Sequence, residues 1–295
     1  MTKLRFAVRI VSCLALALWV CVGLAVPAGA ESGPRYRALL IGEQEYQKEV
    51  NSARTGAANT LEHLRGLFGL ARYGGNTTCA VTTRTDVTAE EAIAAIGEAF
   101  RYAKDGDVSI FYLSCHGFFR DGTSILQFVD GSLLAACDLE LALRQVPGTV
   151  VVLADCCGSG GFVQVEGEAK HFADGFARAF AGETPAFADS RYKVLCSAAP
   201  EEDSYRLGYG DSEGEVATVF GMALCDALGW DMENRRKGAL GADMNYDGRI
   251  TLWEAYLYTA RRVPWYLSLA DGGEGRYAQN VQAYPKGDSF LLFER

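Results

Sequence analysis

Two short apolar segments constrain the fold of this 295-residue chain more than any other feature. Val108–Ser114 (VSIFYLS) and Thr149–Ala154 (TVVVLA) are continuously hydrophobic and rich in β-branched and aromatic residues. Such runs are typical of strands buried on both faces of a sheet. A helical pattern, Leu134–Leu143, lies between them. Strand, helix and strand in this order predict neighbouring elements of a parallel sheet.

The same alternation continues along the chain. Further strands are predicted at Tyr36–Gly42, Thr77–Thr83, Tyr192–Cys196 and Phe290–Phe293. Further helices are predicted at Thr60–Leu70 and Val216–Leu228. Thr88 and Glu91 form a capping box that begins another helix. We therefore predict an α/β fold with a mainly parallel six-stranded sheet and helices on both faces. Residues 162–190 are expected to form a long loop with some helix.

The N-terminus has the pattern of a secretory signal. Three cationic residues precede the apolar run Ile10–Val26, and Ala28–Ala30 supplies small residues for cleavage. We predict a signal peptide over residues 1–30, a mature domain over 31–295, and a secreted or extracytoplasmic protein. An uncleaved N-terminal membrane anchor is the alternative. The remaining sequence has no second apolar stretch long enough to span a membrane.

Charge and cysteine content narrow the function classes. The net charge is −9, and removal of residues 1–30, with three cationic and no acidic residues, leaves −12. This charge argues against nucleic-acid binding and favours cationic partners, such as basic peptides or calcium. Seven cysteines remain, an odd number without metal or redox spacing, so at least one thiol should be free. Cys79, Cys137 and Cys225 have apolar neighbours and are predicted to be core residues.

The groups that can carry chemistry follow the two strongest strands, where ligands gather in parallel sheets. The first strand ends in Ser-Cys-His-Gly, with His116 before glycine. His63 is expected on a helix surface, and His171 in the loop. The second strand continues into Cys156, Cys157 and the glycine-rich turn Gly-Ser-Gly-Gly. Cysteine with histidine is a nucleophile with a general base. The turn lacks the lysine of a P-loop and the spacing of a serine nucleophile elbow.

These two motifs, FYLSCHG and VVLADCCGSG, resemble the caspase, metacaspase, legumain and clostripain superfamily of cysteine peptidases. The resemblance extends to YRALLIGEQEY, TGAANTLEHL, VLCSAAPEEDSYR and VATVFGMALCDAL. It implies a caspase-like (caspase–haemoglobinase) fold. It also implies that Cys157 is the nucleophile, His116 its base, and the N–H groups of Gly117 and Cys157 the oxyanion hole. Cys156 then occupies the variable middle position of the family's Asp-x-Cys motif. The alternative is that Cys156 itself is the nucleophile.

Specificity residues are also implied by the resemblance. Asp155 matches a position that faces the first substrate pocket in metacaspase-like and clostripain-like members, and Ser197 and Asp203 lie in the segment that borders this pocket. A carboxylate there favours an Arg or Lys side chain in the substrate. The alternative for residues 201–203 is a solvated acidic loop.

A second motif near the C-terminus fits a calcium loop. Oxygen ligands at EF-hand spacing, with glycine at the sixth position, are expected from Asp243, Asn245, Asp247, Arg249 through its carbonyl, Thr251 and Glu254. The helix Leu252–Arg261 should follow. The alternative is an Asp/Asn/Gly turn that caps this helix without metal.

The favoured function is therefore a secreted cysteine endopeptidase that cleaves after Arg or Lys, with a structural or regulatory calcium ion and no catalytic metal. The alternatives are a catalytically silent caspase-like binding module and a calcium-binding cell-surface protein. A single fast-reacting thiol at Cys157 distinguishes a peptidase from both. Oligomeric state is left open by the sequence.

Overall fold

The computed structural model describes residues 34–47, 56–74, 77–162, 191–209 and 215–295. All of these residues belong to one compact unit, Pro34–Arg295. The predicted signal peptide, His171 and residues 163–190 of the predicted loop lie outside the described residues. Within the described part of the chain, no helix has the length and apolar character needed to cross a membrane.

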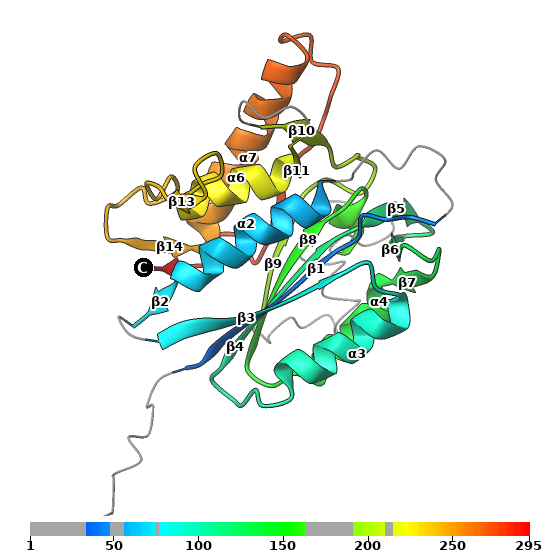
Figure 1. Ribbon diagram of the computed structural model, residues 1–295, viewed down its shortest axis with the longest axis vertical. Helices are drawn as coiled ribbons and strands as arrows, with labels where there is room; N and C mark the ends of the chain where they lie inside the picture. The colour runs from blue at the N-terminus through cyan, green and yellow to red at the C-terminus, as the bar shows by residue number, and fades with distance from the viewer. Residues whose placement is uncertain (1–33, 48–55, 75–76, 163–190, 210–214) are drawn as a thin grey trace, which may run out of the picture. The chain divides into compact units, whose positions relative to one another are not determined.

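A seven-stranded sheet forms the centre of this unit (Figure 1). Its strands, in spatial order, are β15 (Gln282–Tyr284), β9 (Tyr192–Cys196), β8 (Thr149–Asp155), β4 (Val108–Ser114), β1 (Tyr36–Gly42), β3 (Thr77–Thr85) and β2 (Arg72–Tyr73). The five inner strands are parallel, and the two edge strands, β15 and β2, are antiparallel to their neighbours. The prediction of a mainly parallel α/β sheet is confirmed, but the sheet has seven strands rather than six.

Helices cover both faces of the sheet, as predicted (Figure 1). One face packs against α2 (Ala57–Leu70), α6 (Val219–Leu228) and α7 (Leu252–Ala270), and the other against α3 (Ala89–Phe100) and α4 (Ala136–Arg144). Successive strand residues alternate between these layers: Leu40 packs on the first side, and Leu39 on the second. Both strand faces are therefore buried, which explains the continuous hydrophobic runs in the sequence.

Two predicted helices begin later than their sequence patterns indicate. Leu133–Ala135 forms β7, so the helix predicted at Leu134 begins at Ala136. Val216–Thr218 forms β11, and the Thr218 hydroxyl accepts a hydrogen bond from Gly221 N–H to cap α6. Apolar residues continue from strand into helix in both segments, so hydrophobicity alone does not locate the boundary.

Small antiparallel sheets surround the central one. Next to the strand ends, β5 (His116–Arg120), β6 (Thr123–Gln127) and β7 form a three-stranded sheet. The other pairs are β10 (Arg206–Gly208) with β11, β12 (Trp230–Asp231) with β13 (Arg236–Lys237), and β14 (Arg249–Thr251) with β16 (Leu291–Glu294). The final strand predicted from the sequence is β16, and it pairs with β14 outside the central sheet.

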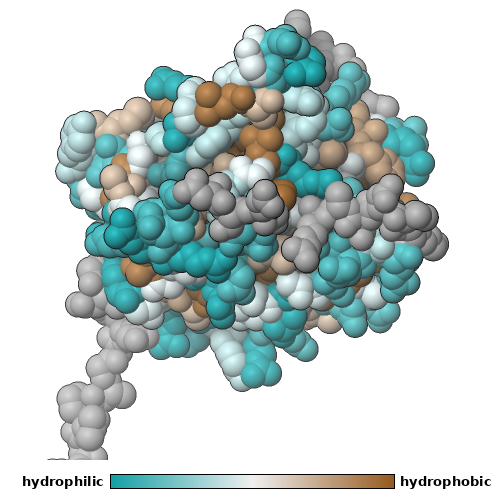
Figure 2. All heavy atoms as spheres, turned by 45° about the horizontal axis from the view of Figure 1, so that its top comes forward, coloured by the Kyte–Doolittle hydropathy of each residue, from teal (hydrophilic) through white to brown (hydrophobic). Residues whose placement is uncertain are grey.

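Two side chains differ from their predicted environments. His63 was expected on the helix surface, but it is buried under Trp230 and Tyr209, which hydrogen-bond its two ring nitrogens at 2.9 and 2.7 Å. Cys137 was expected in the core, but it is exposed in the first turn of α4. Cys79 and Cys225 are buried as predicted. Figure 2 shows a mainly hydrophilic face interrupted by separate hydrophobic patches.

Candidate active site

The ends of β4 and β8 bring the two predicted motifs together. These strands are parallel neighbours, with Ser114 opposite Asp155 at their C-terminal ends. The chain then continues into Cys115 and His116 from β4, and into Cys156 and Cys157 from β8. His116 and Cys157 line the same small pocket, with a volume of about 60 Å³. The strand register alone therefore places a thiol and an imidazole at one edge of the sheet.

Cys157 lies half-buried at the start of the glycine turn. Its Sγ accepts a hydrogen bond from the backbone N–H of Ser204 at 3.2 Å. Burial raises the pKa of the Cys157 thiol to about 11; the Ser204 N–H lowers it, and the charge of Asp203 raises it further. The resting side chain is consequently a neutral thiol at physiological pH, and a base would have to remove its proton to make it a nucleophile.

Glycines allow the two motifs to approach each other closely. A Cβ atom at Gly117 would lie 2.6 Å from the carbonyl oxygen of Cys157. Gly158 has φ +64°, and a Cβ there would lie 2.7 Å from the backbone nitrogen of Phe119. These positions permit only glycine without movement of the neighbouring backbone. The His-Gly and Cys-Gly pairs in the sequence are thus explained by one close contact between β5 and the turn.

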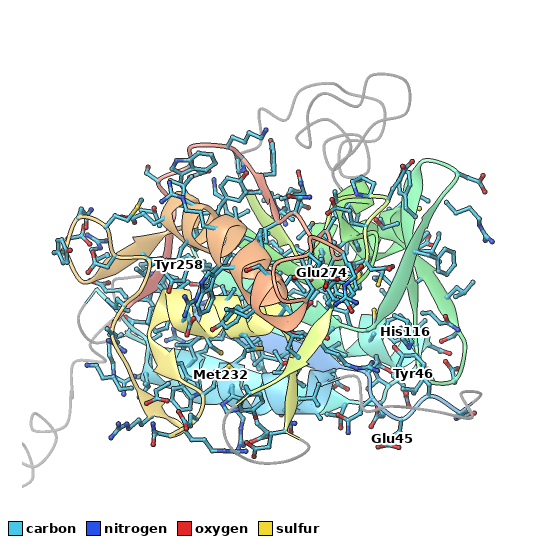
Figure 3. All side chains as sticks on the ribbon, turned by 90° about the horizontal axis from the view of Figure 1, so that it is seen from above. Glu45, Tyr46, His116, Met232, Tyr258 and Glu274 are labelled. Atoms are coloured by element: carbon cyan, nitrogen blue, oxygen red, sulfur yellow. The ribbon has the colours of Figure 1, made fainter. Side chains whose placement is uncertain are left out.

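Tyr46 holds the backbone of His116 in place. The Tyr46 hydroxyl accepts a hydrogen bond from the backbone N–H of His116 at 2.7 Å and donates one to the carbonyl of Gln127 at 3.1 Å. The two rings lie 4.3 Å apart between centroids. Figure 3 shows Tyr46 beside His116. Burial raises the pKa of Tyr46, so its hydroxyl stays protonated and keeps its donor.

Asp155 ends β8 beside the pocket and is 2% exposed. Its carboxylate accepts hydrogen bonds from the hydroxyls of Tyr112 at 2.7 Å, Thr218 at 2.5 Å and Ser204 at 3.1 Å. Burial raises the pKa of Asp155, whereas these three hydrogen bonds lower it. Asp155 therefore connects the floor of the pocket to α6, and through Ser204 to the loop that holds Cys157.

Cys156 points into the core below the turn. It is 2% exposed and belongs to the apolar cluster on the α3 and α4 side of the sheet. Its carbonyl accepts a hydrogen bond from the Ser197 hydroxyl at 3.2 Å. Ser197 is itself fully buried, so it lies beneath the turn rather than in the pocket wall. Of the residues predicted to bind substrate, Asp155 lines the pocket, and Asp203 is exposed next to Cys157.

The loop between β9 and β10 is held in place by two side chains that sequence reasoning did not single out for that role. Gln279, 1% exposed, bonds the Ser197 carbonyl and the Tyr205 N–H. The Glu202 carboxylate accepts from the backbone N–H groups of Ala199 at 3.0 Å and Asn280 at 2.7 Å. Glu202 is therefore a structural anchor rather than part of a solvated acidic loop.

The predicted calcium loop adopts a compact turn. The carboxylate of Asp243 accepts from the N–H groups of Asp247 and Gly248, and the Asn245 side-chain oxygen also accepts from Asp247 N–H. These oxygens consequently lie side by side, as a cation site requires. Glu254 instead accepts from Thr251 in a capping box at the start of α7.

Across the described residues, no group of three or more His, Cys, Asp or Glu side chains is arranged to hold a metal ion. Oxygen ligands of the Asn and backbone type are common in calcium sites. The donor set of residues 243–254 fits calcium chemically, provided that Glu254 turns away from Thr251 to reach the ion.

A larger cavity lies away from these residues. It has a volume of about 830 Å³ and lies among α6, α7, β10 and β12, lined in part by Met222, Trp230, Met232, Tyr258 and Tyr266. Met232 and Tyr258 lie well apart from His116 and Tyr46 in Figure 3. This cavity contains no paired nucleophile and base, so its size does not make it the reaction site.

No protein-family model matches this chain, and no curated protein matches its sequence. Solved structures with a similar fold include the following two. Caspase-1 from Spodoptera frugiperda is 13% identical, with a TM-score of 0.53 and coverage of 88% of each chain. Protein GSU0716 from Geobacter sulfurreducens is 15% identical, with a TM-score of 0.50, and the match covers 86% of this chain and 94% of that one. The chain therefore has a caspase-like α/β fold.

Several residues of the site carry no strong sequence signal. Ser204 and Thr218 lie far from Asp155 and Cys157 in sequence and contact them only in the folded chain. Gln279 acts one contact further away, through its hydrogen bond to the Ser204 hydroxyl. Tyr112 lies within a buried strand, where a tyrosine resembles any other core aromatic residue. A buried tyrosine hydroxyl needs a partner, which is the only hint that the sequence offers.

Proposed function

We propose that this chain is a cysteine endopeptidase in which Cys157 is the nucleophile and His116 the general base. The main support is that Cys157 and His116 follow two register-paired strands and line one pocket. A silent binding module would not require both groups at this place. The caspase-like fold is consistent with the proposal, although the likeness to solved structures concerns the fold alone.

The reaction follows from the state of the thiol. The raised pKa of Cys157 keeps the resting thiol protonated. His116 accepts this proton as the sulfur attacks the substrate carbonyl, and a thioester forms. The C–N bond breaks as the thioester forms, and the leaving amine takes the proton from His116; water then hydrolyses the thioester to the acid and restores the Cys157 thiol. The backbone N–H groups of Gly117 and Cys157 are proposed to stabilise the oxyanion.

The edge of β10 offers a docking place for an extended substrate. Only alternate residues bond across an antiparallel pair, and Tyr205 and Tyr209 bond to the β11 side. The backbone groups of Arg206 and Gly208 consequently face the other edge of β10. Arg206 also lines the pocket beside Cys157. A peptide that adds to this edge would be led to the thiol.

For specificity, we propose that the substrate residue before the cleaved bond is Arg or Lys. The buried carboxylate of Asp155 at the pocket floor supports this proposal, because a cation there forms charge-assisted hydrogen bonds. Arg206 lies exposed at the rim and would repel a cation held near it. The cationic group is therefore assigned to the Asp155 end of the pocket.

A panel of fluorogenic peptides that differ only in the residue before the cleaved bond tests both proposals. Wild type should prefer Arg and Lys, and Cys157→Ala should lose cleavage, whereas the matched variant Cys156→Ala should retain most of it. Asp155→Asn should lower kcat/KM for Arg substrates roughly thirty-fold, the equivalent of about 2 kcal/mol for one charge-assisted hydrogen bond. A preference for Asp would contradict the specificity, and an active Cys157→Ala enzyme would contradict the nucleophile.

We further propose that the loop 243–254 binds calcium in a structural role, and that residues 1–30 direct the chain out of the cytoplasm. The neighbouring oxygens of Asp243 and Asn245 support the first proposal. The cationic start followed by an apolar run supports the second.

A further inference from the structure

The thiols of Cys115 and Cys156 are neighbours in space, although neither has a role in the proposed reaction. Each follows one member of the register pair Ser114 and Asp155, so the two residues continue two parallel strands side by side. Both pack in the cluster on the α3 and α4 side of the sheet. A hydrogen bond to Cys115, together with burial, raises the pKa of Cys156 well above its usual value.

The strand register places this pair near the backbone separation of a disulfide. Neighbouring strands lie about 4.8 Å apart, within the range of roughly 4.4–6.8 Å between Cα atoms that disulfides span. All seven cysteines after residue 30 are unbridged in this structure. The third thiol nearby, Cys157, is turned toward the backbone of Ser204.

We propose that Cys115 and Cys156 are a redox modification site that forms a reversible disulfide, and that this bond displaces His116 and stops catalysis. The disulfide is inferred from the strand register that places Cys115 and Cys156 side by side. The effect on catalysis additionally rests on the peptidase function proposed above.

A low-molecular-weight disulfide is the oxidant by chemical class. Cys115 is the more accessible thiol of the pair, whereas Cys156 is 2% exposed. The Cys115 thiolate attacks one sulfur of the small disulfide, forms a mixed disulfide, and releases one small thiol. The Cys156 sulfur then attacks the Cys115 sulfur, and its proton passes to the departing thiolate to give the second small thiol. The protein loses two hydrogens, and the oxidant is reduced to two thiols.

The geometry predicts which residue moves. A bond of about 2.05 Å replaces a non-bonded contact, so the sulfur atoms must approach by more than about 1 Å. Cys156 is fixed in the core and its carbonyl is hydrogen-bonded by Ser197, so Cys115 is the partner that shifts. Its neighbour His116 is displaced with it, away from the position held by Tyr46. A displacement of about 1 Å in a catalytic group lowers rates on the order of 100-fold.

The test treats the reduced, purified full chain with oxidised glutathione and then digests it without reductant for mass spectrometry. A cross-linked Cys115–Cys156 peptide is expected in wild type and in Cys157→Ala, and it should be absent in Cys156→Ser. Treated wild type should lose peptidase activity about 100-fold and recover it with dithiothreitol. Treated Cys115→Ser should lose less than two-fold, because only the buried Cys156 thiol of the pair remains. Cys156→Ser can keep a glutathione adduct at Cys115, so it serves only as the control for the cross-link, with Cys156→Ala as a second variant if it does not fold.

Glutathione adducts or cross-links at other cysteines only, without a Cys115–Cys156 peptide, would overturn the modification site. A cross-link that leaves activity unchanged would overturn the displacement of His116. The peptide map of Cys157→Ala requires no catalysis, so it decides the disulfide even if reduced wild type cleaves no peptide and the proposed function fails.

Discussion

At the scale of single residues, the chemistry of this site is set by burial. Cys157 and Asp155 are both removed from water, and in each case this raises the pKa while nearby hydrogen bonds oppose the change. The Ser204 backbone and hydroxyl contact both side chains. A substrate cation bound at Asp155 would therefore lie one hydrogen bond away from the loop that holds the proposed nucleophile, Cys157.

Glu43 gives a measurable consequence of burial. Its fully buried carboxylate accepts from the N–H groups of Val87 and Val129, both at 3.1 Å. Burial raises the pKa of Glu43 from 4.5 to about 7. Because the folded pKa exceeds the unfolded one, this stability contribution is complete below pH 4.5 and is lost as the pH rises through 7. The free energy of unfolding should fall by up to about 3 kcal/mol over this interval.

Urea titrations of wild type and Glu43→Gln at pH 4.5 and pH 8 measure this effect. Glu43→Gln should not show the fall in unfolding free energy between these two pH values. It will also be less stable at both, because the amide NH₂ of glutamine faces the backbone N–H of Val87 or Val129. Equal pH dependence in both proteins would show that Glu43 titrates normally.

At the scale of elements, side chains from distant segments connect α2 to the small strand pairs β10–β11 and β12–β13. His63 of α2 is hydrogen-bonded by Trp230 of β12 and paired with Tyr209 beyond β10. Burial lowers the pKa of His63 to about 4, so the ring is neutral at physiological pH. The same helix was predicted from its apolar spacing, but the partners of His63 depend on the tertiary fold.

His63→Ala should lower the free energy of unfolding by roughly 2–4 kcal/mol, because it leaves a buried Tyr209 hydroxyl and the Trp230 indole N–H without partners. Arg65→Ala, on the exposed side of the same helix, is the matched control and should change it by less than about 0.5 kcal/mol. Equal losses in chemical denaturation would contradict this role for His63.

The segment between β13 and α7 provides a second prediction at this scale. Calcium at one hundred times its dissociation constant should stabilise the fold by about 2.7 kcal/mol and raise the melting temperature by roughly 5–10 °C. Asp243→Asn should lose this rise, whereas Glu233→Gln, an exposed acid outside the loop, should keep it. A melting temperature unaffected by calcium and by chelator would favour the alternative of a metal-free capping turn.

At the scale of the whole molecule, the architecture was predictable because the inner strands are buried on both faces. β1, β4 and β9 have the predicted bounds, and β8 extends one residue further, through Asp155. The short edge strands and the sheet β5–β6–β7 were missed, because short, partly exposed strands leave no strong hydrophobic period. The site residues that could be predicted are those next to the two strand ends in the chain. Ser204 and Thr218 join Asp155, and Gln279 joins Ser204, only after folding.

The central claim is that Cys157 is a nucleophile activated by His116. A peptide chloromethyl ketone that ends in Arg tests it most directly, with peptide mapping by mass spectrometry to locate the label. We expect one label, on Cys157, which forms in wild type, is strongly slowed in His116→Ala, and is absent after Cys157→Ala. A label on Cys156 or another cysteine, or equally fast labelling without His116, would contradict the account.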